Sequence, residues 1–241
     1  MESNRVRDQV ALVTGASSGI GRATALLFAR HGARVVVTAR RQSRLEAVAR
    51  GCRDAGGAAE IFAGDAADEE TAVGAVGLAL VQFGRLDVVV NCAGQGNYKP
   101  LVETSSSDFD ELLRANLRSS FLFARHAAPV MIEQRSGTIL FVSSVAGLQG
   151  AANESVYSAT KFAQVGLSQS LDAELRPFGI RVGVVCPGGV KSEFALGRGR
   201  TEEGIAQSRM MEAADVAESI LFMVTQPPNT RVPALTVRHM G

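Results

Sequence analysis

The sequence predicts an α/β domain built on a doubly wound parallel β-sheet with helices on both faces. Short runs of β-forming residues alternate with longer helical patterns from one end of the chain to the other. Several of the short runs are continuously apolar, which is typical of strands that are covered on both faces. A glycine-rich turn follows the first run and leads into the first helix. Because no Pro/Gly/Ser-rich linker interrupts the chain, residues 1–241 are expected to form a single domain.

Seven segments are predicted to be strands, and their apolar and β-branched residues support each assignment. In chain order they are Gln9–Thr14, Ala33–Thr38, Ala58–Ala63, Leu86–Val90, Gly137–Val142, Ile180–Val185 and the weaker Leu235–Val237. Helical segments between successive strands allow the right-handed crossovers that parallel strands require.

Helices are predicted where apolar residues recur at helical spacing. In the first helix, Ile20, Ala23 and Leu27 are placed to form one buried face. The helical segments defined in this way are Gly19–His31, Leu112–Gln134 and Val156–Phe178.

The segment 191–211 differs from the rest of the chain. It is rich in Gly, Arg, Ser and Glu and follows the sixth predicted strand. Loops after parallel strands emerge at the edge where open α/β sheets bind ligands. We therefore expect a mobile substrate lid here, with a helix in part of it.

The composition excludes several classes of function. With 25 basic and 24 acidic residues, the net charge of +1 does not favour nucleic acid or anionic membrane as a partner. No apolar run approaches the roughly 20 residues that span a bilayer, and residues 1–8 contain no signal-peptide core. Cys52, Cys92 and Cys186 lie far apart, so free thiols in a cytoplasmic protein are expected. No cluster has metal-ligand spacing, and no metal site is predicted.

The turn after the first strand has the composition of a phosphate-binding turn. It reads T-G-A-S-S-G-I-G, with glycines at Gly15, Gly19 and Gly21. Glycines allow a tight turn and let backbone N–H groups approach a pyrophosphate at a helix N-terminus. Ser17 and Ser18 can add hydroxyl donors. An ordinary strand-to-helix turn is the alternative, but the position directly after the first strand favours dinucleotide binding.

The end of the second strand indicates which dinucleotide is bound. An NAD site usually has an acid there, whereas the 2′-phosphate of NADP calls for arginine. Ala39 occupies the expected position of the acid, and Arg40 and Arg41 follow it. A planar guanidinium suits bidentate phosphate recognition, so the sequence favours NADP over NAD. The alternative is that both arginines only solvate the start of a helix.

Five motifs occur together, and their combination is highly specific. They are Thr14-Gly-x-x-x-Gly-Ile-Gly21, Asn91-Cys-Ala-Gly94, Ser144, Tyr157-x-x-x-Lys161 and Pro187-Gly188. In their order and spacing the chain resembles the short-chain dehydrogenase/reductase family over almost its whole length. The resemblance implies a single-domain Rossmann fold with a seven-stranded parallel sheet. It also implies an NAD(P)-dependent enzyme that acts on CH–OH groups.

The chain departs from the family pattern at two places. Cys92 follows Asn91 where the family commonly has a second asparagine. The ending Arg231–Gly241 lacks the T-G-x-x-x-x-V-D-G-G of many members and is more similar to the branch that acts on small hydroxy acids and related alcohols.

The resemblance also implies which residues bind the cofactor. Asp65 would contact the adenine, and the segment from Asn91 to Gly94 would line the cleft. Pro187, Gly188 and Val190 would hold the nicotinamide amide. The predicted cofactor site comprises Gly15, Ser17, Ser18, Gly19, Ile20, Gly21, Arg40, Arg41, Asp65, Ala66, Asn91, Ala93, Gly94, Tyr157, Lys161, Pro187, Gly188 and Val190.

The predicted catalytic residues are Asn116, Ser144, Tyr157 and Lys161. Tyr157 and Lys161 are four residues apart on a predicted helix, so they project from one face. The ordinary tyrosine pKa of about 10 is too high for a base near neutrality, and a nearby cation would lower it by roughly 1–3 units. Tyr157 would then donate a proton to a carbonyl oxygen that Ser144 orients.

The resemblance gives two further roles behind this pair. Lys161 would hydrogen-bond the nicotinamide ribose, and Asn116 would hold a water on a proton relay behind Lys161. A local backbone role is the alternative for Asn116, because asparagine is a poor helix-interior residue.

These residues predict an NADP(H)-dependent oxidoreductase that interconverts an alcohol and a ketone or aldehyde. A catalytically silent dinucleotide-binding regulator is the alternative, although a pure binder needs no acid–base tyrosine. A methyltransferase on a similar sheet is disfavoured by the arginines after the second strand. Arg198, Arg200 and Arg209 in the lid are expected to be solvated surface residues, and recognition of an anionic substrate is the alternative.

The expected partners are a small-molecule substrate and further copies of the chain. The helices Leu112–Gln134 and Val156–Phe178 resemble those through which family members form oligomers. Phe121, Leu122 and Phe162 are expected to point outward, consistent with a homodimer or homotetramer, unless they face the sheet.

Overall fold

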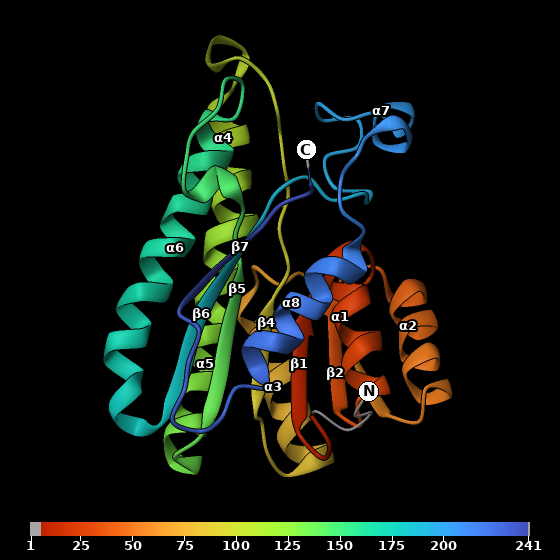
Figure 1. The fold of residues 1–241 in the computed structure, drawn as a ribbon, viewed down its shortest axis with the longest axis vertical. Coiled ribbons are helices and arrows are strands. Elements are labelled where there is room, and N and C mark those ends of the chain that lie inside the picture. Colours follow the sequence, from red (N-terminus) through yellow and green to blue (C-terminus); the bar gives the residue numbers. More distant parts are fainter. Residues whose placement is uncertain (1–5, 241) are drawn as a thin grey trace.

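The computed structural model describes residues 6–240, in which parallel strands alternate with helices. The first five residues of the N-terminal segment, where no signal peptide is expected, and Gly241 lie outside the described residues. Seven parallel strands form one sheet in the order β3-β2-β1-β4-β5-β6-β7 (Figure 1). Their bounds are β1 Val10–Thr14, β2 Arg34–Ala39, β3 Ala58–Ala63, β4 Val88–Asn91, β5 Gly137–Val142, β6 Ile180–Pro187 and β7 Ala234–Val237.

The seven predicted strands are confirmed, with small shifts at their ends. β3 and β5 have the predicted bounds, whereas β4 begins at Val88 rather than Leu86. Asp87 lies just outside β4 and accepts a hydrogen bond at 2.9 Å from the backbone N–H of Val10, where β1 begins. The continuous apolar runs in β1, β4 and β5 are buried on both faces of the sheet, as expected.

Helices cover both faces of the sheet (Figure 1). One hydrophobic core lies under α1 (Gly19–Arg30), α2 (Gln42–Asp54) and α8 (Ala213–Val224). The other lies under α3 (Glu69–Phe83), α5 (Ser119–Gln134) and α6 (Ser155–Leu175). The strand order reverses between β1 and β4, so the site of ligand binding is expected above the carboxyl ends of these two strands.

The predicted helix Leu112–Gln134 is wrong at its start. Three segments replace it: α4 (Ser106–Leu112), a π-helical stretch η2 (Leu113–Arg118) and α5. Ser105 caps α4 through a reciprocal pair of hydrogen bonds with Asp108, which moves the helix start toward the N-terminus. The predicted helix Val156–Phe178 corresponds to α6 followed by the 3₁₀ turn η4 (Arg176–Phe178).

The predicted outward apolar residues divide into two groups. Phe121 and Phe162 are 45% and 46% exposed, as expected. Leu122 is only 2% exposed and belongs to the core under α5, so its outward orientation is wrong. Within residues 6–240, no helix combines the length and apolar character needed to cross a membrane.

The segment 191–211 connects β6 to α8 and lies beyond the carboxyl ends of the strands (Figure 1). Its base is closed by a parallel bridge between Val190 and Met211. It contains the short helix α7 (Glu202–Gln207). Two short 3₁₀ turns, η1 (Leu101–Glu103) and η3 (Val145–Gly147), lie at the same end of the sheet.

Candidate active site

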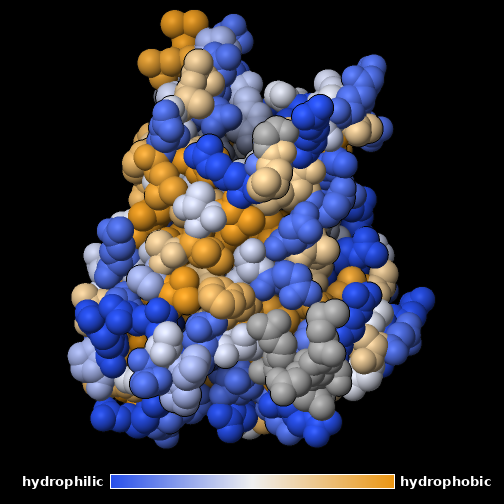
Figure 2. All heavy atoms as spheres, in the orientation of Figure 1, coloured by the Kyte–Doolittle hydropathy of each residue, from blue (hydrophilic) through white to orange (hydrophobic). Residues whose placement is uncertain are grey.

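A cavity of about 630 Å³ opens above the carboxyl ends of the central strands. Figure 2 shows the surface hollowed between the protrusion beside α4 and the segment that carries α7. The structure brings the predicted site residues together, because all of them except Asn91 and Asn116 line this cavity. Residues of β2, β5, α6 and β6 therefore meet residues that directly follow β1 and β4.

Asn91 and Asn116 are buried behind the cavity wall. The side-chain amide of Asn91 donates to the carbonyl of Leu140 at 3.3 Å. The side chain of Asn116 accepts from the N–H of Gln95 at 2.7 Å and donates to Gln95 O at 3.0 Å and to Thr160 Oγ1 at 2.9 Å. Both side chains therefore hold the loop or strand that borders the cavity.

The glycine-rich turn has the geometry that a pyrophosphate requires. Gly15 has φ of +62°, and a Cβ there would lie 2.9 Å from the backbone of Ala93. A Cβ at Gly21 would lie 2.6 Å from Gly15 O, so neither position accepts a side chain. Ser18 precedes α1 without capping it through its side chain, which leaves N–H groups of the first turn for an anion. The turn fits a dinucleotide phosphate.

Arginines border the cavity where β2 ends. Arg41 donates to the hydroxyls of Ser17 and Ser18 at 3.0 Å, so the predicted phosphate-binding groups contact one another. Arg44, which the sequence analysis missed, and Arg41 both form ion pairs with Glu193 of the 191–211 segment. Arg41 is the N-cap of α2, and Arg44 follows it by three residues in the first turn, which was the available signal.

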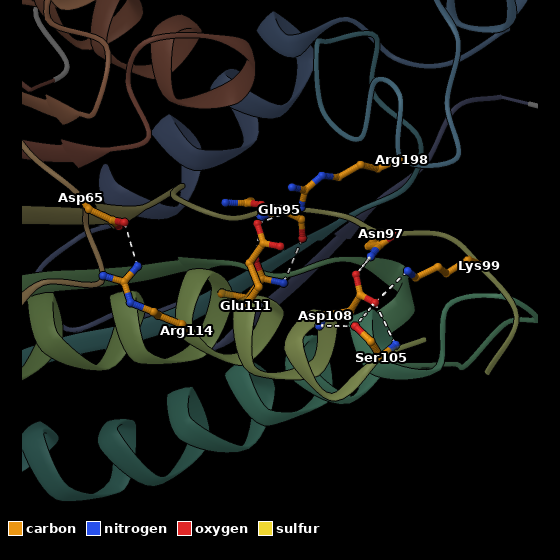
Figure 3. Close-up of polar contacts among 10 residues, drawn as sticks. Asp65, Gln95, Asn97, Lys99, Ser105, Asp108, Glu111, Arg114 and Arg198 are labelled. Atoms are coloured by element: carbon orange, nitrogen blue, oxygen red, sulfur yellow. Dashed lines mark hydrogen bonds and ion pairs between the residues drawn. The ribbon is translucent and has the colours of Figure 1, made fainter. Parts of the chain in front are cut away.

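Asp65 lies at the cavity edge after β3 and is held by two donors. It accepts from the N–H of Ala67 at 2.9 Å and from Arg114 at 2.8 Å (Figure 3). Burial raises the pKa of Asp65, but these hydrogen bonds outweigh it and hold the pKa below its ordinary value. The carboxylate is therefore ionised and oriented at the predicted adenine end.

Tyr157 and Lys161 lie on α6 and face the cavity as a pair. The Lys161 ammonium is 5.7 Å from the centre of the Tyr157 ring, and both side chains are buried. Lys161 Nζ donates to Val142 O at 3.0 Å and to Gln164 Oε1 at 2.9 Å. Burial lowers the pKa of Lys161 to about 8, because the ammonium loses solvation that neutral acceptors replace only in part.

The pKa of Tyr157 differs from the sequence-based expectation. Burial raises it above its ordinary value, and the adjacent Tyr98 adds to this effect, while a hydrogen bond with Ser144 opposes it. In this protonation state the phenol is a proton donor. Ser144 Oγ also accepts from the N–H of Ala146 at 3.1 Å, which orients the hydroxyl at the end of β5.

Aromatic rings surround Tyr157 in the cavity. Tyr98 contacts the Tyr157 ring edge-on at 5.5 Å between centroids, and Phe194 lies at 5.8 Å from the same ring. Arg200 lies over the rings of Tyr98 and Phe194 at 5.5 and 5.6 Å. Glu154 also lines the cavity, and burial raises its pKa. The part of the cavity around Tyr157 is thus lined by aromatic rings, with the acidic Glu154 and the basic Arg200 beside them.

The three arginines singled out in the segment 191–211 have different environments. Arg198 donates to Gln95 and pairs with Glu111, each at 2.9 Å (Figure 3). Arg200 lines the cavity, and within residues 6–240 no ion pair involves it. Arg209 does not line the cavity. Arg198 also lines the cavity, but Gln95 and Glu111 engage its guanidinium, so Arg200 is the one of the three that is placed to meet a substrate.

The loop that carries Tyr98 is fastened at both ends. Asp108 on α4 binds Asn97 at 2.8 Å and Lys99 at 2.7 Å (Figure 3). The hydrogen bonds from Lys99 and Ser105 hold the pKa of Asp108 below its ordinary value. The backbone N–H of Tyr98 donates to Arg198 O at 2.9 Å. A Cβ at Gly199, where φ is +106°, would lie 2.5 Å from Tyr98 Cβ, so this close approach requires glycine.

The comparison with protein families decides the identity of the fold and site. A family model described as short chain dehydrogenase matches residues 9–203. The chain belongs to the short-chain dehydrogenase/reductase family. Uncharacterized oxidoreductases of Staphylococcus aureus (strain USA300) and Thermotoga maritima are similar to this short-chain dehydrogenase/reductase. The Staphylococcus aureus protein is 32% identical over 96% of this chain and 97% of its own. The Thermotoga maritima protein is 35% identical over 89% of each chain.

Solved structures agree with this assignment. A metagenomic short-chain oxidoreductase in complex with NADP is 35% identical, with a TM-score of 0.85 over 98% of this chain and 100% of that one. An alcohol dehydrogenase from the archaeon Thermococcus sibiricus, complexed with 5-hydroxy-NADP, is 28% identical, with a TM-score of 0.86 over 96% of each chain. The protein is an NAD(P)-dependent short-chain dehydrogenase/reductase enzyme.

Proposed function

We propose that this short-chain dehydrogenase/reductase uses NADP(H) to interconvert a small-molecule alcohol and a ketone or aldehyde, with Tyr157 as general acid and base. The observation that carries the proposal is the convergence of Ser144 with the buried pair Tyr157 and Lys161 in the cavity that also contains the glycine-rich turn. A dinucleotide-binding regulator would need the turn but not this arrangement.

The proposed reduction needs three actions from the protein. The hydride comes from the nicotinamide of the bound cofactor. The carbonyl oxygen of the substrate accepts hydrogen bonds from Ser144 and Tyr157, and Tyr157 transfers its phenolic proton to that oxygen. The Lys161 ammonium stabilises the phenolate that this transfer leaves. In the oxidative direction the phenolate takes the proton back from the alcohol.

We further propose that NADP is preferred over NAD. Arg40 and Arg41 occupy the end of β2 without an acid at Ala39, and NADP or its 5-hydroxy derivative is bound in two similar structures. The segment 191–211 would act as the substrate lid, because Glu193, Phe194 and Arg200 in it line the cavity. Free thiols at all three cysteines are consistent with a cytoplasmic enzyme.

Mixing the protein with NADPH and a panel of ketones and aldehydes, while absorbance is followed, tests the activity. We expect turnover with at least one compound and a loss of about 10³-fold in Tyr157→Phe, since general acid catalysis contributes 10²–10⁴-fold. NADPH binding should stay within about twofold, because the phenol acts on the substrate. NADPH binding without turnover on any compound would favour the silent regulator.

Tyr98→Phe is the matched control for this variant. It removes the other tyrosine hydroxyl of the chain from the same cavity while both rings stay in place. We expect a loss of at most about tenfold, the effect of one neutral hydrogen bond. Equal losses in both variants would contradict the assignment of proton transfer to Tyr157.

The cofactor preference is tested by Arg40→Ala. Loss of one charge-assisted contact to the 2′-phosphate should raise the dissociation constant for NADPH by about tenfold or more and leave that for NADH within about twofold. Arg50→Ala, an exposed arginine of α2 that does not line the cavity, controls for net charge. Equal effects of Arg40→Ala on both cofactors would contradict the preference.

A further inference from the structure

Gln164 is a fully buried polar side chain one helical turn beyond Lys161 on α6. Its Oε1 accepts from Lys161 Nζ at 2.9 Å. Its Nε2 donates to Asn116 O at 2.9 Å and to Ser120 Oγ at 2.7 Å. The carboxamide therefore joins the ammonium to the backbone of the π-helical stretch η2.

The orientation of this carboxamide is fixed by its partners. Asn116 O is an acceptor, and Ser120 Oγ already donates to it at 2.8 Å, so the serine oxygen is free to accept from Gln164. A flipped amide would place its oxygen against Asn116 O and its NH₂ group against the ammonium of Lys161. Two unfavourable contacts between buried groups would replace two favourable ones. The Gln164 oxygen consequently faces Lys161.

We propose that Gln164 is a positioning residue that holds the Lys161 ammonium beside Tyr157 and favours its protonated form. This inference rests on the proposed function, in which that ammonium stabilises the Tyr157 phenolate. A carboxamide neither releases nor takes up a proton near neutral pH. Gln164 therefore contacts Lys161 without taking its proton, and the charge stays on Lys161. This role differs from the one that the family resemblance implies for Asn116, which is to hold a water of a proton relay.

The surroundings of Lys161 show why this acceptor matters. The titratable groups that face it are Tyr157 on α6, Cys92 after β4 and Cys186 on β6. Burial raises the pKa of Cys92 to about 12 and also raises that of Cys186, so neither thiol supplies a negative charge. The hydrogen-bond acceptors of the ammonium are Val142 O and Gln164 Oε1. Of these two, only the Gln164 oxygen can be removed by substitution.

The decisive measurement is the pKa of Lys161 itself, taken on the cofactor-free protein. The chain contains three lysines, Lys99, Lys161 and Lys191, so ¹³C-labelled lysine gives few side-chain signals, and Lys161→Met assigns the relevant one. Gln164→Met keeps the length of the side chain but removes its acceptor. We expect the pKa of Lys161 to fall by about one unit below the wild-type value, the effect of one hydrogen bond to a charged group.

Two further variants complete the series. Gln164→Glu has the same shape but carries a charge, and it should raise the pKa of Lys161 above the wild-type value. Gln169→Met changes an exposed glutamine of the same helix and should leave the pKa of Lys161 unchanged. An unchanged pKa in both Gln164 variants, with folding verified by circular dichroism, would overturn the proposal. Gln164→Glu also keeps it testable if Gln164→Met fails to fold.

The pH profile of NADPH-dependent reduction gives a second readout. In Gln164→Met the alkaline loss of rate should begin about one pH unit lower than in the wild type, because Lys161 loses its proton earlier. A purely structural role would lower the rate equally at every pH and would contradict the proposal. If the wild type reduces no compound, the proposed function fails, whereas the titration of Lys161 still decides the role of Gln164.

Discussion

Lys161 is a buried cation whose immediate partners are all uncharged. A carboxylate beside it would raise the pKa but would also cancel the field that the ammonium exerts on Tyr157. Neutral acceptors leave that field intact, at the expense of a pKa lowered to about 8. The residue therefore carries its charge at neutral pH and loses it under mildly alkaline conditions.

The pH dependence of reduction follows from this pKa. Below about pH 8 Lys161 is the ammonium, and above it the neutral amine predominates, so kcat/KM for NADPH should fall about tenfold per pH unit on the alkaline side. This parameter reports the free enzyme, for which the pKa applies. Lys191→Met, which changes a surface lysine paired with Glu212, should keep the wild-type profile. A profile that stays flat to about pH 10 would contradict this assignment.

At this scale, spacing and motif identified Tyr157, Lys161 and Ser144, and all three line the cavity. Gln164 was missed because it has no motif, although its position three residues after Lys161 places it on the same helical face. Its role depends on contact with Asn116, which comes from a different helix. A sequence does not reveal such a contact before the helices are packed.

At the scale of the elements, the segment 191–211 contacts the start of α2 through the carboxylate of Glu193. Glu193 pairs with Arg41 at 2.9 Å and with Arg44 at 2.5 Å, and this contact lowers its pKa. These arginines border the place proposed for the 2′-phosphate of NADP. A carboxylate and a phosphate present similar oxygens to a guanidinium, so the lid and the cofactor are expected to compete for the same cations.

Glu193→Gln tests this competition. Since these pairs are about half exposed, each contributes little, and we expect NADPH to bind only about two- to fivefold more tightly in the variant. The dissociation constant for NADH should be unchanged, because NADH has no 2′-phosphate. Fluorescence titration of both cofactors measures the difference. Weaker NADPH binding in the variant would show instead that Glu193 orients the arginines for the phosphate.

The strands were predicted more closely than the helices. Parallel strands such as β3 and β5 have continuous β-forming runs, and their bounds agree with the prediction. The helix bounds in the region 106–134 do not agree with the prediction. The π-helical stretch η2 has no compositional signature, and its backbone is contacted by Gln164 from α6. Local sequence patterns do not contain that tertiary information.

At the scale of the whole molecule, the outer face of η2 and α5 carries an apolar groove. Leu113, Leu117 and Phe121 line it together with Leu167 of α6. A homodimer or homotetramer, proposed from the sequence, would cover this face with the equivalent helices of a second copy. Burying apolar side chains against each other would provide the free energy of association.

Phe121→Glu is expected to shift the protein to smaller species, because a charge would be buried in the proposed contact. Light scattering at micromolar concentration, combined with size-exclusion chromatography, measures the change. Val81→Glu, on an exposed hydrophobic residue of α3, should leave the assembly unchanged. A wild-type protein that is already monomeric would contradict the proposed assembly.

One contact of the segment 191–211, the proposed lid, limits how the substrate range can be altered. Tyr98 and Gly199 come from distant parts of the chain and touch through a contact that tolerates only a hydrogen on the glycine. Replacement of Gly199 would displace the tyrosine that contacts Tyr157, the proposed proton donor, edge-on, so we expect catalysis to suffer before selectivity changes. Phe194 has no such restriction, so libraries that enlarge the pocket should begin there and keep Gly199 constant.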